Sequence, residues 1–314
     1  MMDLTLFGKQ SETSRLKALH NDGRMPHALM LTGERGIGKK MLARWCALLM
    51  MCENGAEAPC MHCRTCNNIK SDDHPDVIFA KGEKYSADRI REIVQQTALF
   101  PNDGDLRVII FEDCDEMTEI HQNLLLKAIE EPSKYNRYIF TCENTDAVLP
   151  TIKSRVVTIP LSEMSNPDCV SCLVAKGVPE QEATKYILKL GKNPGKILEI
   201  IKDKKKIALQ ESAEKIAQYI ADENEYDTAR EFSGYTDREE LFGIISALYD
   251  IVSRALLPGY EGEGAVKCLK ENLSLKKLYA VTRRIEELNS CSDYNVNAKV
   301  FAAYCASQLF DVIA

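Results

Sequence analysis

A glycine-rich turn near the start of the chain has the residue types of a phosphate-binding loop. It reads G-E-R-G-I-G-K-K from Gly33 to Lys40 and matches the pattern G-x-x-x-x-G-K. Glycines such as Gly33, Gly36 and Gly38 let backbone N–H groups converge on phosphate oxygens, and Lys39 would reach the β- and γ-phosphates. The pattern favours a phosphate site over an ordinary strand-to-helix turn with incidental glycines.

The last position of this turn departs from the pattern. A Ser or Thr hydroxyl there would ligate Mg²⁺, but this chain carries Lys40. An ammonium group has no acceptor lone pair and repels a metal cation. We therefore expect no Mg²⁺ at this site and no hydrolysis by it, while binding of ATP or ADP stays open.

Four cysteines after the turn have the spacing of a zinc site. They lie in M-C-E-N-G-A-E-A-P-C-M-H-C-R-T-C and are Cys52, Cys60, Cys63 and Cys66. Four thiolates on tight turns can surround one Zn²⁺ tetrahedrally and leave no open position for catalysis. The sequence predicts a structural zinc, with His62 as an alternative ligand. A redox pair is disfavoured because the cluster holds four thiols.

The remaining cysteines, the N-terminus and the apolar stretches indicate in which compartment the protein lies. Six cysteines are scattered singly, most of them in apolar runs, as buried free cysteines are: Cys46, Cys114, Cys142, Cys268, Cys291 and Cys305. The N-terminus lacks a basic-then-apolar export pattern, and no apolar stretch approaches the roughly 18 residues of a membrane span. We expect a cytoplasmic protein in a reducing compartment, with no membrane partner.

The charge balance argues against an autonomous nucleic-acid binder. With 40 basic and 47 acidic side chains the formal net charge is −7, and the chain has a single Trp. A protein that binds nucleic acid by itself usually presents a basic field. Any contact with DNA is therefore expected to be local or to depend on partners.

Carboxylates follow a predicted buried strand in the middle of the chain. The run R-V-I-I-F at 107–111 precedes Glu112, Asp113 and Asp115. Open α/β sheets bind ligands at the carboxyl ends of their strands, so we expect these side chains to face the glycine-rich turn. In a hydrolysing site one carboxylate positions Mg²⁺ and a second orients water. The alternative is an acidic turn that begins the next helix.

The elements that position these residues alternate over the first 160 residues. Strands are expected at 27–33, 76–80, 107–111, 138–142 and 156–160, and helices at 39–51, 86–100 and 123–132. This order predicts a mostly parallel sheet with helices on both faces. Only helices are expected afterwards, at 166–176, 181–190, 194–202, 206–221, 238–257, 275–289 and 296–312, with a charged linker at 202–206.

Several motifs together resemble the AAA+ subunits of the bacterial DNA polymerase III clamp loader. They are the phosphate turn, the four cysteines, H-P-D at 74–76, N-L-L-L-K-A-I-E-E-P at 123–132, and Ser154-Arg155 before a strand. The resemblance covers about residues 7–202 well. It implies an α/β fold followed by an all-α part: an AAA+ P-loop domain (1–160) with an inserted zinc module (about 52–66), a helical lid (161–204) and a C-terminal helical collar for assembly (205–314).

In two positions this chain differs from the motor subunits of that family and resembles its delta-prime branch. Motor subunits of the family carry Ser or Thr where this chain has Lys40, and Asp-Glu where it has Glu112-Asp113. The reversed order withdraws the water-positioning carboxylate by about one methylene. The resemblance implies a largely non-hydrolysing subunit. The alternatives are a gamma/tau-type motor ATPase and a zinc-stabilised nucleic-acid-binding module.

The resemblance also implies roles and partners. Arg155 matches the family's Ser-Arg-Cys motif, with Val156 in place of the cysteine, and would act as an arginine finger in a neighbouring subunit's site. Asn144 aligns with a sensor of the γ-phosphate, and Lys196 falls near a second sensor. The implied partners are motor (gamma/tau-type) and delta subunits in a hetero-pentamer, which loads the sliding clamp onto primed DNA.

Overall fold

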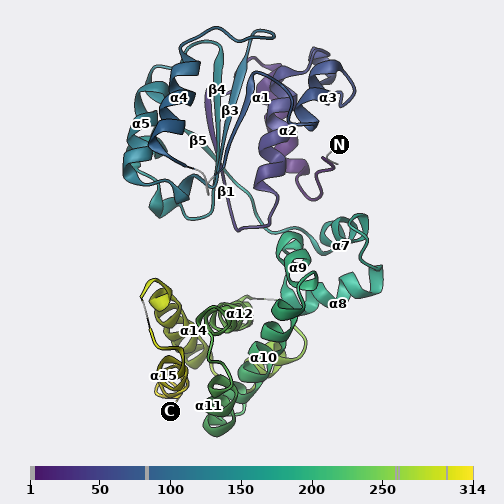
Figure 1. Ribbon diagram of the computed structural model, residues 1–314. Coiled ribbons are helices and arrows are strands. Elements are labelled where there is room, and N and C mark those ends of the chain that lie inside the picture. The colour runs from purple at the N-terminus through teal and green to yellow at the C-terminus, as the bar shows by residue number, and fades with distance from the viewer. Residues whose placement is uncertain (1–3, 82–84, 259, 261, 295, 314) are drawn as a thin grey trace. The chain divides into compact units, whose positions relative to one another are not determined.

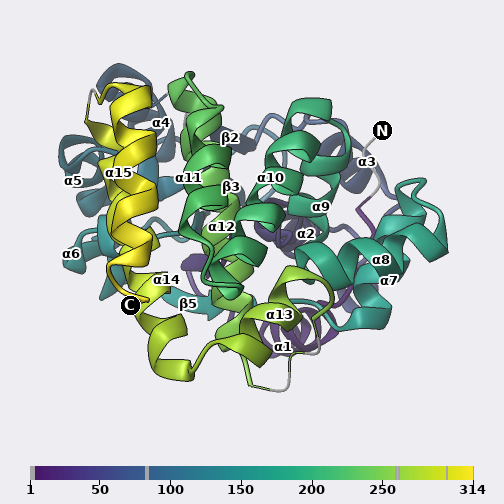
Figure 2. The ribbon, with the colours of Figure 1, turned by 90° about the horizontal axis from the view of Figure 1, so that it is seen from below.

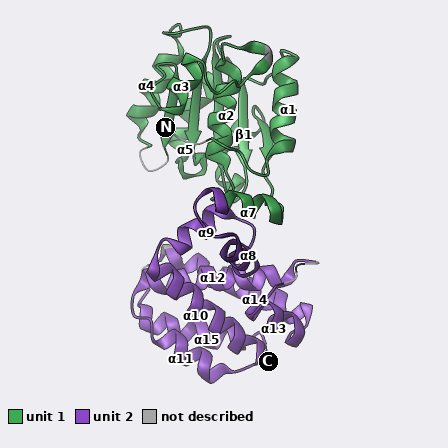
Figure 3. Cartoon of the chain, turned by 90° about the vertical axis from the view of Figure 1, so that its right-hand side faces the viewer, with its two compact units in different colours: residues 1–172 green, residues 173–314 purple. Residues whose placement is uncertain are grey.

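The computed structural model describes residues 4–81, 85–258, 260, 262–294 and 296–313 (Figure 1). The chain divides into two compact units, residues 1–172 and 173–314 (Figure 3). The predicted lid, 161–204, is divided between them, and the three-domain organisation stays a prediction. Among the described helices, none is both long and apolar enough to span a membrane.

A five-stranded parallel sheet forms the centre of the first unit. Its order is β2-β3-β4-β1-β5, with β1 (Ala28–Thr32), β2 (Val77–Lys81), β3 (Arg107–Glu112), β4 (Asn136–Cys142) and β5 (Val157–Pro160). Every residue of β1 and β3 is buried, which is typical of a parallel sheet that is covered on both faces. The predicted α/β class and the strand positions are confirmed. The carboxyl ends of all five strands lie at one edge of the sheet.

Helices cover both faces of this sheet (Figure 1). One side carries α1 (Gln10–Asn21), α2 (Lys39–Met51) and α3 (Arg64–Lys70), and the other carries α4 (Ala87–Thr97) and α5 (Glu119–Glu130). Alternate strand residues feed two apolar cores: Leu29 and Leu31 pack in the core that includes α2, whereas Met30 packs with α4 and α5. This alternation is the two-residue period of a strand.

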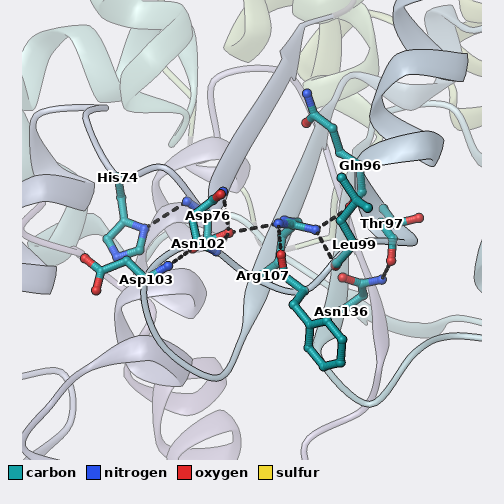
Figure 4. A network of polar contacts seen from close by, with 10 residues as sticks. His74, Asp76, Gln96, Thr97, Leu99, Asn102, Asp103, Arg107 and Asn136 are labelled. Atoms are coloured by element: carbon teal, nitrogen blue, oxygen red, sulfur yellow. Dashed lines mark hydrogen bonds and ion pairs between the residues drawn. The ribbon is translucent and has the colours of Figure 1, made fainter.

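A buried ion pair holds the amino-terminal end of the sheet together (Figure 4). Asp76, just before β2, accepts from Arg107, the first residue of β3, at 3.1 Å. The Asp76 carboxylate also accepts from the backbone N–H groups of Asn102 (2.9 Å) and Asp103 (2.6 Å). The H-P-D motif therefore has a structural role in this unit, because its aspartate fixes the loop that leads into β3.

Arg107 also contacts the carboxyl end of α4. Its guanidinium donates to the backbone carbonyls of Gln96, Leu99 and Phe100, the latter two at 3.0 Å each. The expected helix at 86–100 ends earlier, at Thr97, and Arg107 binds carbonyls beyond that end; the Gln96 carbonyl also accepts from the N–H of Leu99 at 3.1 Å. Leu99 and Phe100 remain 66% and 73% exposed.

The second unit is all-helical, as the sequence predicts. After α7 (Asn166–Ala175), which crosses the boundary, it contains α8 (Glu180–Leu190), α9 (Pro194–Ile201), α10 (Lys204–Ala221), α11 (Glu225–Ser233), α12 (Arg238–Leu256), α13 (Ala265–Asn272), α14 (Leu275–Asn289) and α15 (Ala298–Phe310). Helix α12 packs against α10 and α14, and α11 packs against α15 (Figure 2). Together these helices enclose one apolar core.

The charged run at 202–206 is mostly helix rather than a linker. Asp203 caps α10 by accepting from the N–H of Lys205 at 2.9 Å, so the lysines that follow Asp203 form the first turn of that helix. An aspartate at the N-cap satisfies a backbone donor that would otherwise lack a partner. Lys205 and Lys206 also pair with Glu240 and Glu199, which reduces the repulsion between the consecutive ammonium groups.

Candidate functional site

The glycine-rich turn joins β1 to α2 at the carboxyl edge of the sheet. Gly33 has a φ of 143°, and a Cβ there would lie 2.7 Å from the carbonyl oxygen of Leu161, so only glycine fits. Gly38 has a φ of 101° and directly precedes α2. The turn therefore has the strand–turn–helix setting that phosphate binding at a helix N-terminus requires.

Lys39 folds back over this turn. Its ammonium donates to the carbonyl oxygens of Gly33 (2.6 Å) and Glu34 (3.0 Å), and the residue is 5% exposed. Burial lowers the pKa of Lys39, and the nearby carboxylates of Glu143 and Asp113 oppose that shift. A phosphate bound to this ammonium would compete with the two carbonyl groups.

Lys40 lies against the carboxylates that follow β3. Its Nζ is 2.5 Å from Oδ2 of Asp113 and 3.3 Å from Oε2 of Glu112. Burial alone would lower the pKa of Lys40, but the hydrogen bond to Asp113 and the two negative charges outweigh it and raise that pKa. The structure thus brings Lys40, Glu112 and Asp113 together as one ion-paired group at the sheet edge.

Asp113 reaches Lys40 from a strained backbone. Its φ of 54° is in the left-handed region, which non-glycine residues rarely adopt, and its N–H donates to Oγ1 of Thr141 at 2.8 Å. Such a conformation costs on the order of 1 kcal/mol and persists only where the surroundings fix it. The hydroxyl on β4 is one of these fixing contacts, and the sequence did not point to it.

The two sensor candidates belong to different units. Asn144 follows β4 at the same sheet edge; its N–H donates to Oδ2 of Asp115 at 3.0 Å, and its Oδ1 accepts from the N–H of Asp146 at 2.9 Å. The Asn144 carboxamide therefore caps the short turn that follows the strand. Lys196 lies in α9 of the second unit, where its ammonium pairs with Asp250 of α12.

Arg155 follows the short helix α6 (Pro150–Lys153) and lies at the surface of the first unit. Its guanidinium pairs with Oε1 of Glu130, at the end of α5, at 2.8 Å. It also donates to the carbonyl of Thr151 (2.9 Å) and to Oγ of Ser154 (3.0 Å). Because its side chain is 37% exposed, the contacts that hold it within the chain are a weak surface ion pair and these two hydrogen bonds.

The four cysteines of the predicted zinc module are gathered at one point. Their sulfur atoms all lie within 4.8 Å of one another. Backbone N–H groups support them: the N–H of Cys60 donates to the sulfur of Cys52, that of Cys63 to Cys60, and that of Cys66 to Cys63, each at 3.3 Å. Such hydrogen bonds favour thiolates and, led by one from His62, lower the pKa of Cys60 to about 6, whereas burial raises the pKa of Cys52 and Cys66.

This donor set fits a structural zinc. A tetrahedral ion with bonds of about 2.3 Å places its four sulfurs roughly 3.8 Å apart, which the cluster allows, and needs no further ligand. His62 is not among the clustered ligands, since its Nδ1 lies 2.6 Å from the carbonyl oxygen of Cys60. The structure thus favours the four-cysteine set over the alternative with His62.

We expect Cys63→Ser to remove zinc from this module and to lower the melting temperature of the chain. Structural zinc contributes about 10–16 kcal/mol to the folding of zinc-finger peptides, so the short α3 would lose its main support. Zinc content by mass spectrometry and thermal melting with and without a chelator measure this. Cys291→Ser, at a half-buried cysteine outside the cluster, is the control and should retain the metal. If the wild-type chain is folded without zinc and the four thiols of this module react freely, the prediction of a structural zinc is wrong.

Comparison with known proteins places these features in a family. The family described as "DNA polymerase III, delta subunit" matches residues 8–165, half of the chain. This chain belongs to the DNA polymerase III delta subunit family. The match covers the phosphate turn, the cysteine cluster and Arg155, and it confirms the resemblance that these motifs indicated.

Relatives of this chain carry the names of different subunits: delta′, gamma and gamma/tau. DNA polymerase III subunit delta′ of Bacillus subtilis is 30% identical over 154 residues, 48% of this chain and 47% of that protein. DNA polymerase III subunit gamma of Buchnera aphidicola subsp. Schizaphis graminum is 29% identical over 183 residues, 57% of this chain and 47% of that protein. The chain thus spans about half the length of the curated relatives it matches.

Among solved structures, the chain aligns with a DNA polymerase III gamma subunit-related protein from Thermotoga maritima. The alignment has a TM-score of 0.48 and 17% identity, and it covers 94% of this chain and 98% of that one. Relatives named delta′ and gamma both occur, so the names alone do not fix the type of subunit.

Proposed function

We propose that this chain is a delta-prime-type subunit of the DNA polymerase III clamp loader. In this role it would hydrolyse little or no ATP itself and would complete the ATP site of a neighbouring motor subunit. The observation that carries the proposal is the ion-paired group formed by Lys40, Glu112 and Asp113.

This group supports a site without magnesium. A metal-dependent phosphate site needs a hydroxyl from the turn and free carboxylates opposite it. Here the hydroxyl is replaced by an ammonium that already lies 2.5 Å from one carboxylate and 3.3 Å from the other. An incoming divalent cation would have to displace Lys40 and overcome its charge. The site can still offer backbone N–H groups and Lys39 to a phosphate, so binding of ATP or ADP is compatible with the proposal.

Arg155 supports the second half of the proposal. A guanidinium aimed at the phosphates of an adjacent subunit stabilises charge that develops in the transition state. Arg155 is at the surface, and its partner Glu130 holds it through a half-exposed ion pair that costs little to break. We infer that a neighbouring motor subunit takes up this side chain when the ring assembles.

In the proposed function, the helical second unit and the cysteine module have structural roles. The bundle from α10 to α15 would serve as the collar that joins this chain to motor and delta subunits. The cysteine module would hold a structural zinc beside α2. The sliding clamp and primed DNA would be reached through the assembled complex, since the net charge of −7 offers no general field for DNA.

The main alternative is a gamma-type motor, which the names of several relatives favour. Hydrolysis by the isolated chain distinguishes the two. We expect turnover of ATP with Mg²⁺ to stay at background, and to be the same for Lys39→Ala. Steady Mg²⁺-dependent hydrolysis that Lys39→Ala abolishes would instead identify a motor. Salt-sensitive binding of DNA by the chain alone would favour a nucleic-acid module.

Reconstitution tests the positive side of the proposal. The full chain is mixed with motor and delta subunits, and ATP-driven loading of the clamp onto primed DNA is measured. We expect loading to require this chain and to be retained by Lys39→Ala. Loading that proceeds equally well without the chain would overturn the proposed function.

A further inference from the structure

A second group of metal-ligating side chains lies beside the phosphate site. Cys114 and Asp115 follow β3, and Cys142 ends β4, which pairs with β3 in the sheet. One ligand atom from each of the three lies within 4.8 Å of the other two. The cysteines are 3% and 0% exposed, so their sulfur atoms meet inside the unit rather than at its surface.

The carboxylate of Asp115 is fixed in position and has one free oxygen. Its Oδ2 accepts from the backbone N–H groups of Glu143 (3.2 Å) and Asn144 (3.0 Å). Its Oδ1 is buried and has no hydrogen-bond partner within the described part of the chain. A buried carboxylate oxygen without a partner is costly, because it has lost water and gained nothing in exchange. A cation ligated by Oδ1 would remove this cost.

We propose that Cys114, Asp115 and Cys142 form a second metal site that takes a thiophilic divalent cation of the zinc class. Tetrahedral Zn²⁺ with sulfur and oxygen ligands at about 2.0–2.3 Å places those ligands roughly 3.3–3.8 Å apart, which the cluster allows. Two thiolates select such a cation over Mg²⁺ or Ca²⁺. Binding releases the two thiol protons to solvent, and the fourth position is left for a water molecule.

The charge around the cluster suits an anionic metal complex. Two thiolates, one carboxylate and a divalent ion sum to a single negative charge. The ammonium of Lys39 interacts electrostatically with Asp115 and Cys142, although more strongly with Glu143 and Asp113, so it offsets part of that charge. The two thiols distinguish the cluster from an acidic patch that would attract any cation, because sulfur ligands select a thiophilic metal. The interaction with Lys39 also links the metal site to the phosphate turn.

Metal binding would stiffen the loop after β4. Asp115 already bridges the end of β3 to Glu143 and Asn144, and a bound ion would tie both strands to the same carboxylate. This inference does not depend on the proposed function, since it concerns only the contents of the first unit. A chain with no role in clamp loading could still hold this ion.

The test counts zinc in the full-length chain after equilibration with a zinc buffer. We expect two zinc ions per chain in the wild type and one in Cys114→Ser, since the module at residues 52–66 keeps its own ion. Cys46→Ser is the matched control, because Cys46 is equally buried but lies outside both clusters, and it should keep two. One zinc in the wild type, or two in Cys114→Ser, would overturn the proposal.

If Cys114→Ser fails to fold, a milder variant tests the same proposal. Asp115→Asn retains an oxygen that can accept from both backbone N–H groups but loses the charge. We expect it to weaken binding of the second zinc by about 10-fold or more while leaving the first unchanged. Cobalt serves as a spectroscopic probe, because thiolate-to-metal absorption should rise in two steps in the wild type. Unchanged affinity in Asp115→Asn, or a single absorption step, would contradict the site.

Discussion

Arg155→Ala is expected to slow ATP hydrolysis by about 10³–10⁵-fold at the motor site that this chain is proposed to complete. The guanidinium would neutralise charge on the transferred phosphate, and alanine leaves that charge uncompensated. Arg155→Lys should not rescue the rate, because an ammonium lacks the planar fork that engages two oxygens at once. ATP turnover and clamp loading by the reconstituted complex measure the loss.

The controls separate this role from folding and from general surface charge. Lys127→Ala removes an exposed positive charge from α5 near Glu130 and should leave turnover unchanged. Glu130→Gln weakens the intrachain partner of Arg155 and should preserve or raise the rate. Size-exclusion chromatography should show intact assembly for all variants. Normal turnover by an assembled Arg155→Ala complex would remove the arginine-finger assignment.

Asp76→Ala is expected to lower the free energy of unfolding of the first unit by about 3–5 kcal/mol. Asp76 is 0% exposed and Arg107 is 3% exposed, so the variant leaves a buried guanidinium without its counter-charge. It also leaves the N–H groups of Asn102 and Asp103 without their acceptor. Both losses act on the loop that leads from α4 into β3.

Fluorescence of Trp45 measures this effect in the unit concerned. Trp45 is the single tryptophan, it is 5% exposed, and it lies in α2 of the first unit. Denaturant unfolding followed by Trp45 therefore reports that unit without interference from the helical one. Asp88→Ala breaks an exposed ion pair of α4 with Arg91 and should cost less than about 1 kcal/mol. Equal costs for the two variants would refute the importance of the buried pair.

The pattern of apolar residues along the sequence predicted the positions of the strands well. All five strands were placed within about two residues of their observed bounds, because continuous apolar runs bounded by turn residues leave little ambiguity. Helices α1, α3, α6, α11 and α13 were missed. They are short or polar, and packing rather than apolar spacing stabilises them.

The site was predictable where neighbours in sequence make it, and less so where distant segments meet. The turn at Gly33–Lys40 and the cysteine module are local patterns, so their geometry follows from spacing. Cys114 and Cys142 were interpreted as lone buried cysteines, yet the pairing of β3 with β4 brings them together. The partner of Arg155 on α5 and the role of Asp76 likewise depend on contacts across the fold, which no local pattern encodes.

The ion pair between Lys40 and the carboxylates after β3 affects how the charge of this site responds to nucleotide binding and release. A cation that is part of the polypeptide does not leave with a spent nucleotide and does not vary with the free magnesium of the cell. The edge of the sheet around Glu112 and Asp113 therefore keeps the same charge throughout a cycle. Under the proposed function, the changes that accompany ATP hydrolysis would occur in the neighbouring subunits, beside a site in this chain whose charge stays constant.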